Sequence, residues 1–302
     1  MLNKEEVINR LKLVQDYICT KLEALDGVAK FREDNWVREE GGGGRTRILS
    51  DGTIIEKGGV NFSAVHGPVS DIMKKQLGLE GNEFLATGVS IVIHPKNPFH
   101  PIMHMNVRYF EMDTGAYWFG GGIDMTPHYI DFNKAQIFHK DLKAVCDQYH
   151  SNFYSRFKTW ADDYFYIPHR NETRGVGGIF YDHLTEKDGV SKEELLNFAI
   201  DLGELFPKVY ADQIEFDRFP AFTESNEEWR NLRRGRYVEF NLVHDRGPKF
   251  GLKTGGRVES ILMSLPKNAS WFYDFQPDKG SKEELTLKWL KKDVDWSNLA
   301  SK

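Results

Sequence analysis

The sequence predicts a single α+β domain over residues 1–302, with an antiparallel sheet at its centre and helices before and after it. One observation is a side-chain period of two between residues 84 and 126, which is typical of strands. A second is the spacing of three and four apolar positions in the flanking segments, which is typical of amphipathic helices. A third is that no internal repeat, low-complexity linker or shift in composition divides the chain. Together they favour one α+β domain over several.

The individual elements follow from local signals. Apolar residues from Val7 to Leu25 predict a first helix that begins near Asn3 and ends at Gly27. Strands at 84–94, 103–112 and 116–126 have short connections, which predicts an antiparallel meander. Four consecutive glycines, 41–44, predict a loop because glycine is costly in a regular element. Further predicted elements are helices at 131–149, 151–164 and 225–234, helices after the capping-box pairs Ser191/Glu194 and Ser281/Glu284, and strands at 236–243 and 258–265.

Composition narrows the classes of function. The net charge of −5 gives no basic footprint, so we expect no nucleic-acid partner. No apolar run reaches the roughly 20 residues of a membrane span, and the N-terminus has no signal or transit pattern, so we expect a cytoplasmic protein. Cys19 and Cys146 lie far apart in the sequence, which indicates a reducing compartment rather than a disulfide framework. Motifs for dinucleotides, P-loop phosphates, HExxH zinc and a serine nucleophile are absent.

A polar row on the second strand of the meander is the first candidate site. By parity His104, Asn106 and Arg108 share one strand face, as do Ser90 and His94 on the strand before it. A solvent-exposed face would explain any polar row, but it usually favours Lys, Glu and Thr. A titratable group, an amide and a carboxylate-binding fork together also fit a ligand surface.

Glycines mark two further candidate segments. Gly120 to Gly122 precede Asp124 inside a strand, where they indicate either close approach of a flat ligand or a bend or bulge in the sheet. A buried Asp124 would need hydrogen-bond donors, and pyrrole N–H groups could supply them. The turn that contains Gly255, Gly256 and Arg257 suits a carboxylate, although an ordinary turn explains it as well. Four more arginines in glycine-rich segments are candidate carboxylate anchors: Arg45, Arg47, Arg170 and Arg174.

A metal site is a competing hypothesis. His139, Asp141 and His169 resemble a two-histidine, one-carboxylate iron site. His139 and Asp141 lie two residues apart in a predicted helix, however, where such residues do not face each other.

At these residues the sequence closely resembles the oxygen-dependent coproporphyrinogen III oxidases. The matching stretches are GGGGRTRIL (41–49), EKGGVNFSAVHG (56–67), ATGVSIVIHPKNPFHPIMHMNVRYFE (86–111), FGGGIDMTP (119–127), DDYFYIPHRNETRGVGGIFYD (162–182) and RGRYVEFNLVHDRGPKFGLKTGGRVESILMSLP (234–266). The resemblance implies a large, flat sheet of about seven antiparallel strands between helical layers. It also implies a homodimer with an interface in residues 237–272.

The resemblance further implies a reaction and its residues. Coproporphyrinogen III and O2 would give protoporphyrinogen IX, CO2 and hydrogen peroxide, with no cofactor beyond O2. His104 would be the proton donor and Asp124 the carboxylate at the pyrrole nitrogens. The other positions that the resemblance implies are Ser90, Asn106, Val107, Arg108, Gly255, Gly256 and Arg257 for the substrate, and His94, His104, His139 and His169 for a divalent metal in some bacterial members. One alternative is a tetrapyrrole carrier without turnover on the same scaffold. Another is a non-haem metal oxygenase or hydrolase built on His94, His104, His139 and His169.

Overall fold

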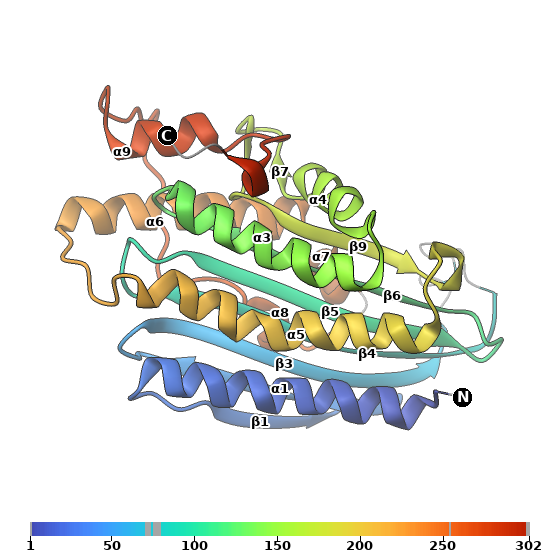
Figure 1. The fold of residues 1–302 in the computed structure, drawn as a ribbon. Coiled ribbons are helices and arrows are strands. Elements are labelled where there is room, and N and C mark those ends of the chain that lie inside the picture. Colours follow the sequence, from blue (N-terminus) through green and yellow to red (C-terminus); the bar gives the residue numbers. More distant parts are fainter. Residues whose placement is uncertain (1, 70–73, 75–79, 254, 300–302) are drawn as a thin grey trace.

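The computed structural model describes residues 2–69, 74, 80–253 and 255–299. At its centre lies a seven-stranded sheet with the order β1-β2-β3-β4-β5-β6-β9 (Figure 1), and every neighbouring pair is antiparallel. The α+β class and the seven-stranded sheet are therefore confirmed. The strands are β1 (Arg32–Val37), β2 (Gly42–Ser50), β3 (Ile55–Pro68), β4 (Glu83–Pro95), β5 (Ile102–Met112), β6 (Tyr117–Thr126) and β9 (Gly178–Leu184).

One face of the sheet is covered by long helices. The helices α1 (Lys4–Asp26), α3 (Phe132–Tyr149) and α5 (Lys192–Glu215) lie across it, and α4 (Phe153–Tyr164) packs beside β9 (Figure 1). The strands bury one alternate set of side chains against these helices, which forms the main core. Core members from the sheet include Val89, Ile91, Met105, Val107 and Ile123. The strands at 84–94, 103–112 and 116–126 and the helices at 131–149 and 151–164 are thus confirmed to within a few residues.

A second set of elements lies against the other face. They are α6 (Glu224–Glu239), a π-helical turn η2 (Phe240–His244), α7 (Arg246–Lys253) and α8 (Val258–Leu262). The backbone carbonyl of Ser260 accepts a hydrogen bond from Asn61 of β3, and the sulfur of Met263 occupies the space beside Gly59 where a side chain would stand. Tyr237 of α6 packs on Val92 and Ile102. The sheet is therefore sandwiched between helices, as the resemblance implies.

The predicted strands at 236–243 and 258–265 are wrong. Residues 236–239 continue helix α6 and residues 240–244 form η2, while residues 258–262 form α8. The β-branched and alternating apolar residues suggested strands, but the residues that the fold buries in the first segment are Arg236, Tyr237, Phe240 and Asn241. Their spacing of three and four is that of a helix. In the second segment Ser260 and Met263 face the sheet with the same spacing.

The predicted loop at 41–44 is also wrong, because Gly42 to Gly44 begin strand β2. The glycines are needed for close packing rather than for chain mobility. A Cβ on Gly44 would stand 2.3 Å from Cζ2 of Trp36, and one on Gly42, whose φ is +80°, would stand 2.2 Å from the carbonyl oxygen of Ala64. Strands β1 and β3, which flank these glycines, were not predicted from the sequence either.

The remaining chain closes the fold around α3 and α4. It contains the small hairpin β7 (Tyr166–Ile167) and β8 (Glu172–Thr173), the turn η1 (Glu186–Asp188), helix α9 (Lys282–Trp289) and the turn η3 (Trp296–Asn298). The capping box at Ser191 and Glu194 is formed at the start of α5, and Ser281 caps α9. Within the described residues, no helix combines the length and the apolar character needed to cross a bilayer.

Candidate active site

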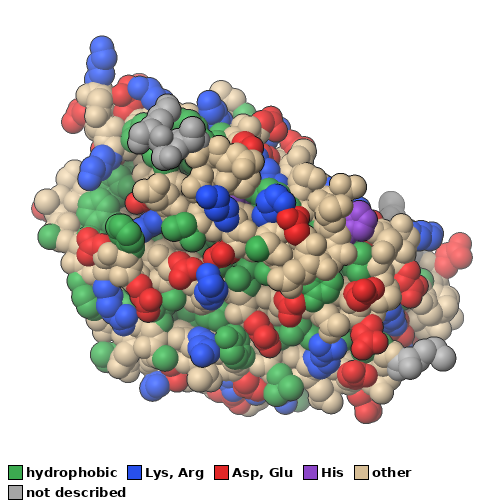
Figure 2. Space-filling model, viewed as in Figure 1, with side chains coloured by type: hydrophobic (Ala, Val, Ile, Leu, Met, Phe, Trp, Pro, Cys, Tyr) green, Lys and Arg blue, Asp and Glu red, His purple; other side chains and the backbone are tan. Residues whose placement is uncertain are grey.

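The polar row lies on the sheet face that carries α6 to α8. In the strand register Ser90 stands opposite Asn106, and Asn106 opposite Gly122. Two residues before Asn106 on the same strand, His104 stands opposite Asp124. The expectation that these side chains share one face is confirmed. On the opposite, helical face, positive and negative side chains are interspersed (Figure 2), so that view shows no large patch of a single sign.

A buried carboxylate joins two of the site's basic groups. Asp124 is 1% exposed and so is the side chain of Arg174. Arg174 donates to both oxygens of Asp124, from Nη2 to Oδ1 at 2.6 Å and from Nε to Oδ2 at 3.1 Å. The Nδ1 atom of His104 lies 2.8 Å from Oδ1 of the same carboxylate. The described structure therefore surrounds Asp124 with protein donors rather than leaving it open toward a ligand.

The electrostatics fix the protonation of this group. Burial would raise the pKa of Asp124, but the charge of Arg174 and the hydrogen bond from His104 outweigh it and lower the pKa below the ordinary value. An ionised carboxylate only accepts hydrogen bonds, so Nδ1 of His104 carries the hydrogen. The Nε2 atom of His104 is then left to exchange a proton with a ligand. This Asp–His arrangement resembles a general acid–base pair.

Aromatic rings hold Arg174 in place. Its guanidinium carbon lies 4.4 Å from the centre of the Phe165 ring and 4.7 Å from those of Tyr237 and Phe240. Its Nη1 donates to the side-chain oxygen of Asn241 at 2.9 Å. These contacts come from Phe165, which follows α4, and from α6 and η2, so the position of the Asp124 carboxylate depends on both helical layers.

Arg108 is the arginine of the row that remains partly accessible. Its Nη1 donates to Asn106 Oδ1 at 3.0 Å, and its Nη2 lies 3.0 Å from Oδ2 of Asp182 on β9. Ser90, His104 and Asn106 are likewise only half-buried. The side chain of Val107 instead lies in the hydrophobic core on the other face. Any contact of Val107 with a ligand of the polar face would therefore use its backbone.

Gly255, Gly256 and Arg257 lie on the same side of the sheet as the row. Arg257 precedes α8, and Ser260 of α8 forms a 2.9 Å hydrogen bond with Thr46 of β2. Arg257 itself is paired with Asp34 of β1 at 2.6 Å. Gly255 has a φ of +74° and no atom near the position of a side chain. Thr254, which belongs to the predicted turn, lies outside the described residues.

The other candidate arginines are engaged elsewhere. Arg45 and Arg47 point to the sheet face that α1, α3 and α5 cover, where both pair with Asp16 of α1. Arg170 forms a two-pronged pair with Glu239 at the end of α6. These three arginines are structural pairs in this fold, so the expectation that they anchor a ligand finds no support in the geometry.

Protein atoms account for the three glycines in β6. A Cβ on Gly120 would stand 2.5 Å from Oδ1 of Asp182, and one on Gly121 would stand 2.7 Å from the hydroxyl of Tyr181. The pairing of β6 with β9 is irregular between Phe119 and Gly121. Of the two interpretations of these glycines, the structure therefore favours a bulge with close packing over a flat ligand.

The four histidines proposed as metal ligands do not converge. His94 is buried with Nε2 on the carbonyl of Ser264, and His139 lies on α3 between the hydroxyl of Tyr154 and the carbonyl of Val176. Burial lowers the pKa of His139 to about 3. His169 is exposed, next to His244 and Glu239. No two of the four, His104 included, share a hydrogen-bond partner. Across the described part of the chain, no three His, Cys, Asp or Glu side chains are grouped to hold a metal ion.

Several residues of the site were not identified from the sequence. Arg174 was considered as an anchor for a ligand, whereas its partner is Asp124. Asn241, Asp182 and Asp34 were not singled out at all. Strand parity could have identified Asp182. It lies four residues after Gly178, which pairs with Asp124, so Asp182 and Asp124 share one face of the sheet.

This half-open sheet face combines a buried Asp–His–Arg group with two partly accessible arginines, side chains whose chemistry suits carboxylates. Residues 6–296 match the family described as Coproporphyrinogen III oxidase. The chain is 48% identical over 288 residues to Coproporphyrinogen-III oxidase 1, chloroplastic, of Arabidopsis thaliana, covering 90% of this chain and 74% of that protein. It is 43% identical over 320 residues to the oxygen-dependent coproporphyrinogen-III oxidase of Prochlorococcus marinus (strain MIT 9312), covering 98% and 93%.

A third relative is the mitochondrial oxygen-dependent coproporphyrinogen-III oxidase of Rattus norvegicus, 47% identical over 296 residues, with 93% of this chain and 66% of that protein covered. The chain thus belongs to the coproporphyrinogen III oxidase family. The resemblance that was inferred from the sequence motifs is confirmed.

Proposed function

We propose that this protein catalyses the oxygen-dependent oxidative decarboxylation of two propionates of coproporphyrinogen III, a step of haem biosynthesis. The products are protoporphyrinogen IX, CO2 and hydrogen peroxide. Family membership and the names of the relatives support the reaction. The observation that carries it in the structure is the Asp124–His104 pair, which lies in the same strand register as the accessible arginine Arg108.

The reaction is balanced by O2 alone. Each propionate side chain, R–CH2–CH2–COOH, loses CO2 and one hydrogen from its inner carbon and becomes a vinyl group. The two electrons and two protons released reduce one O2 to one H2O2. The propionate is the net two-electron donor and the ring remains a porphyrinogen, so we propose that no cofactor beyond O2 is required. The four histidines lie apart from one another, which argues against a metal ion that all four would bind together.

The residues of the polar face have separate roles in this proposal. Arg108 and Arg257 bind propionates through charge-assisted hydrogen bonds, and Ser90, Asn106 and the backbone at Gly255 and Gly256 complete the surface. His104 exchanges a proton with the substrate through Nε2.

Asp124 acts through His104. Its ionised carboxylate fixes the tautomer of the imidazole and stabilises the imidazolium when His104 takes up a proton. Arg174 keeps that carboxylate charged in a buried position. Asp124 is therefore a positioning residue for His104, whereas the sequence suggested a direct contact with the pyrrole nitrogens.

The decisive experiment compares aerobic with anaerobic incubation of the purified protein with coproporphyrinogen III, followed by porphyrin chromatography. The expected result is protoporphyrinogen IX with two CO2 per substrate, in air only. A tetrapyrrole carrier would bind the substrate and release no CO2, which would overturn the proposed activity. Product formation without O2 would overturn the oxygen dependence.

We also propose that the protein is a homodimer that buries part of residues 237–272. The support is a concentration of exposed large apolar side chains in this segment: Leu242, Val243, Leu252, Val258, Trp271 and Phe272. A large exposed apolar surface is typical of an interaction site. Sedimentation should show a dimer, and Val258→Asp with Phe272→Asp should shift it toward monomer. Val37→Asp, at an exposed site outside the segment, is the control. A wild-type monomer at all concentrations would contradict the proposal.

The cytoplasmic location stays a prediction from the sequence.

A further inference from the structure

A β-bulge presents two consecutive side chains of β9 on the polar face. Gly121 pairs with Tyr181 and Phe119 with Leu184, so Gly120 stands opposite both Asp182 and His183. His183 has a φ of +52°, in the left-handed region that few side chains other than glycine adopt. Its ring lies 4.8 Å from the ring of Trp118. Such bulges re-aim side chains and are frequent next to active sites.

The first of these two side chains, Asp182, contacts Arg108. Oδ2 of Asp182 lies 3.0 Å from Nη2 of Arg108, and its Oδ1 accepts the backbone N–H of His183 at 3.0 Å. The guanidinium lies over Gly120, whose missing side chain would stand 2.7 Å from Nε of Arg108. The side chain of Arg108 is therefore fixed on one side by Asp182, on another by Asn106, and from below by the glycine.

The other proposed anchor has the same arrangement at the opposite edge of the sheet. Arg257 is paired with Asp34 of the edge strand β1, just as Arg108 is paired with Asp182 of the edge strand β9. The side chains of Arg257 and Asp34 are 31% and 33% exposed, and those of Arg108 and Asp182 are 37% and 24% exposed. Ion pairs this accessible contribute little to stability. A contribution to folding therefore does not by itself explain why both arginines are paired with an aspartate.

We propose that Asp182 and Asp34 are positioning residues for the two carboxylate-binding arginines. Each aspartate holds its guanidinium in one orientation, and each offsets part of its positive charge. An entering propionate then meets an oriented arginine but competes with a resident carboxylate. Orientation favours the chemical step, whereas the competing charge weakens binding and aids release of the product. This inference rests on the proposed function of the site.

A double-mutant cycle tests the inference for Asp182. Asp182→Asn removes the charge and keeps an acceptor for the N–H of His183. We expect KM for coproporphyrinogen III to fall about 3- to 5-fold because a competing charge is gone, and kcat to fall about tenfold because the arginine is less well oriented. In an Arg108→Ala background the same substitution should change either constant by no more than about twofold. The matched control is Asp212→Asn, which breaks an ion pair of a 34% exposed aspartate on α5 with Lys208. It should change neither constant.

The outcomes distinguish a failure of the proposed role of Asp182 from a failure of the proposed activity. If the wild-type protein turns over and Asp182→Asn has equal effects with and without Arg108, Asp182 does not act through Arg108 and the inference is overturned. An increase in KM on removal of the charge would also overturn it. If the wild-type protein does not turn over, the proposed function fails first. Should Asp182→Asn fail to fold, Asp34→Asn in the presence and absence of Arg257→Ala gives the same test at the other edge.

Discussion

Replacement of Arg174 by methionine should destabilise the protein strongly, because it leaves a buried charge without a partner. Arg174 and Asp124 are each 1% exposed, and the arginine makes two hydrogen bonds to the carboxylate. Methionine fills a similar volume and still contacts the three surrounding rings, so the loss of packing is small. The main cost is the unpaired carboxylate, and we expect the free energy of unfolding to fall by about 3–5 kcal/mol.

The effect should depend on pH with a sign that follows from the pKa of Asp124. In the wild-type protein this pKa is lowered, so its contribution to stability is present above the unfolded pKa of about 4 and is lost as the pH falls. Without Arg174, burial raises the pKa instead, and the carboxyl group becomes neutral at higher pH. The difference between Arg174→Met and wild type should therefore be largest near pH 7 and shrink as the pH is lowered.

Urea unfolding followed by circular dichroism at several pH values measures this difference directly. The double variant Asp124→Asn, Arg174→Met should recover at least about 1 kcal/mol relative to Arg174→Met, because no charge remains buried. A destabilisation below about 1 kcal/mol that is the same at pH 5 and pH 7 would refute the assignment of Asp124 as a buried, ionised carboxylate.

Three further predictions concern activity. Asp124→Asn should lower kcat about 10²-fold and change KM only a few-fold. Steady-state kinetics and the melting temperature of the same variant test this, and a loss of activity that merely follows the unfolded fraction would contradict it. Arg108→Ala should weaken substrate binding by about 1.5–3 kcal/mol, seen as a higher KM, and a wild-type KM would exclude Arg108 as an anchor. Chelator-treated protein should keep its activity; a loss that one divalent ion restores would show that a metal is required.

The sequence predicted the middle of the sheet well and its edges poorly, for a physical reason. Buried positions alternate with partly exposed ones along β5 and the middle of β4, whereas β6 is buried over most of its length. Strands β1 to β3 carry glycines and arginines whose partners are far away in the sequence, such as Asp16 for Arg47. A local pattern cannot reveal such partners, so residues 41–44 had the composition of a loop.

The same distinction applies to the site. Parity alone places His104, Asn106 and Arg108 together, and the register adds Asp124. The pairing of Asp124 with Arg174 spans 50 residues, and it also needs a loop whose path no sequence pattern specifies. The bulge in β9 adds one residue after Tyr181, so His183 joins Asp182 on the polar face, and this shift in the alternation has no obvious mark in the sequence.

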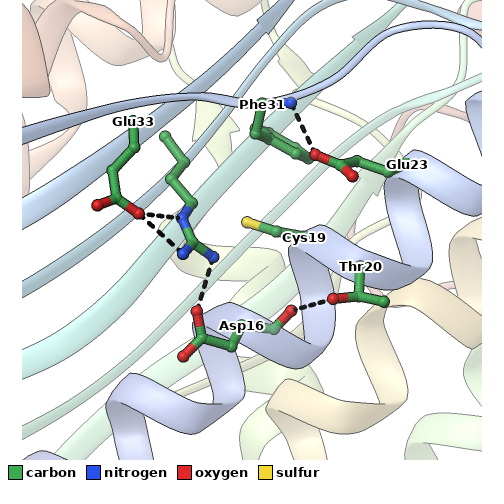
Figure 3. A pocket seen from close by; sticks show the side chains of 7 residues that line it. Asp16, Cys19, Thr20, Glu23, Phe31 and Glu33 are labelled. Carbon is green, nitrogen blue, oxygen red and sulfur yellow. Dashed lines mark hydrogen bonds and ion pairs between the residues drawn. The ribbon is translucent and has the colours of Figure 1, made fainter.

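The two cysteines bear on how the protein withstands the hydrogen peroxide that the proposed reaction forms. Cys19 borders a hollow of about 290 Å³ between α1 and strands β1 and β2, together with Asp16, Glu33 and Arg47 (Figure 3). Its side chain is nonetheless 3% exposed. Burial, only partly offset by Arg47, raises its pKa to about 12. Burial also raises the pKa of Cys146, which lies in the core on α3.

Peroxide attacks the thiolate, so these pKa values imply slow oxidation. With a pKa of about 12, fewer than about one Cys19 in 10⁴ is a thiolate near neutral pH. We expect the native protein to show almost no reaction of either cysteine with a maleimide or with roughly millimolar peroxide, and to show two reactive thiols after unfolding in urea. Val28→Cys, at an exposed position just after α1, is the positive control and should react rapidly in the folded protein. If native Cys19 reacts as fast as that control, the hollow admits reagents to the sulfur, and neither burial nor the raised pKa protects it.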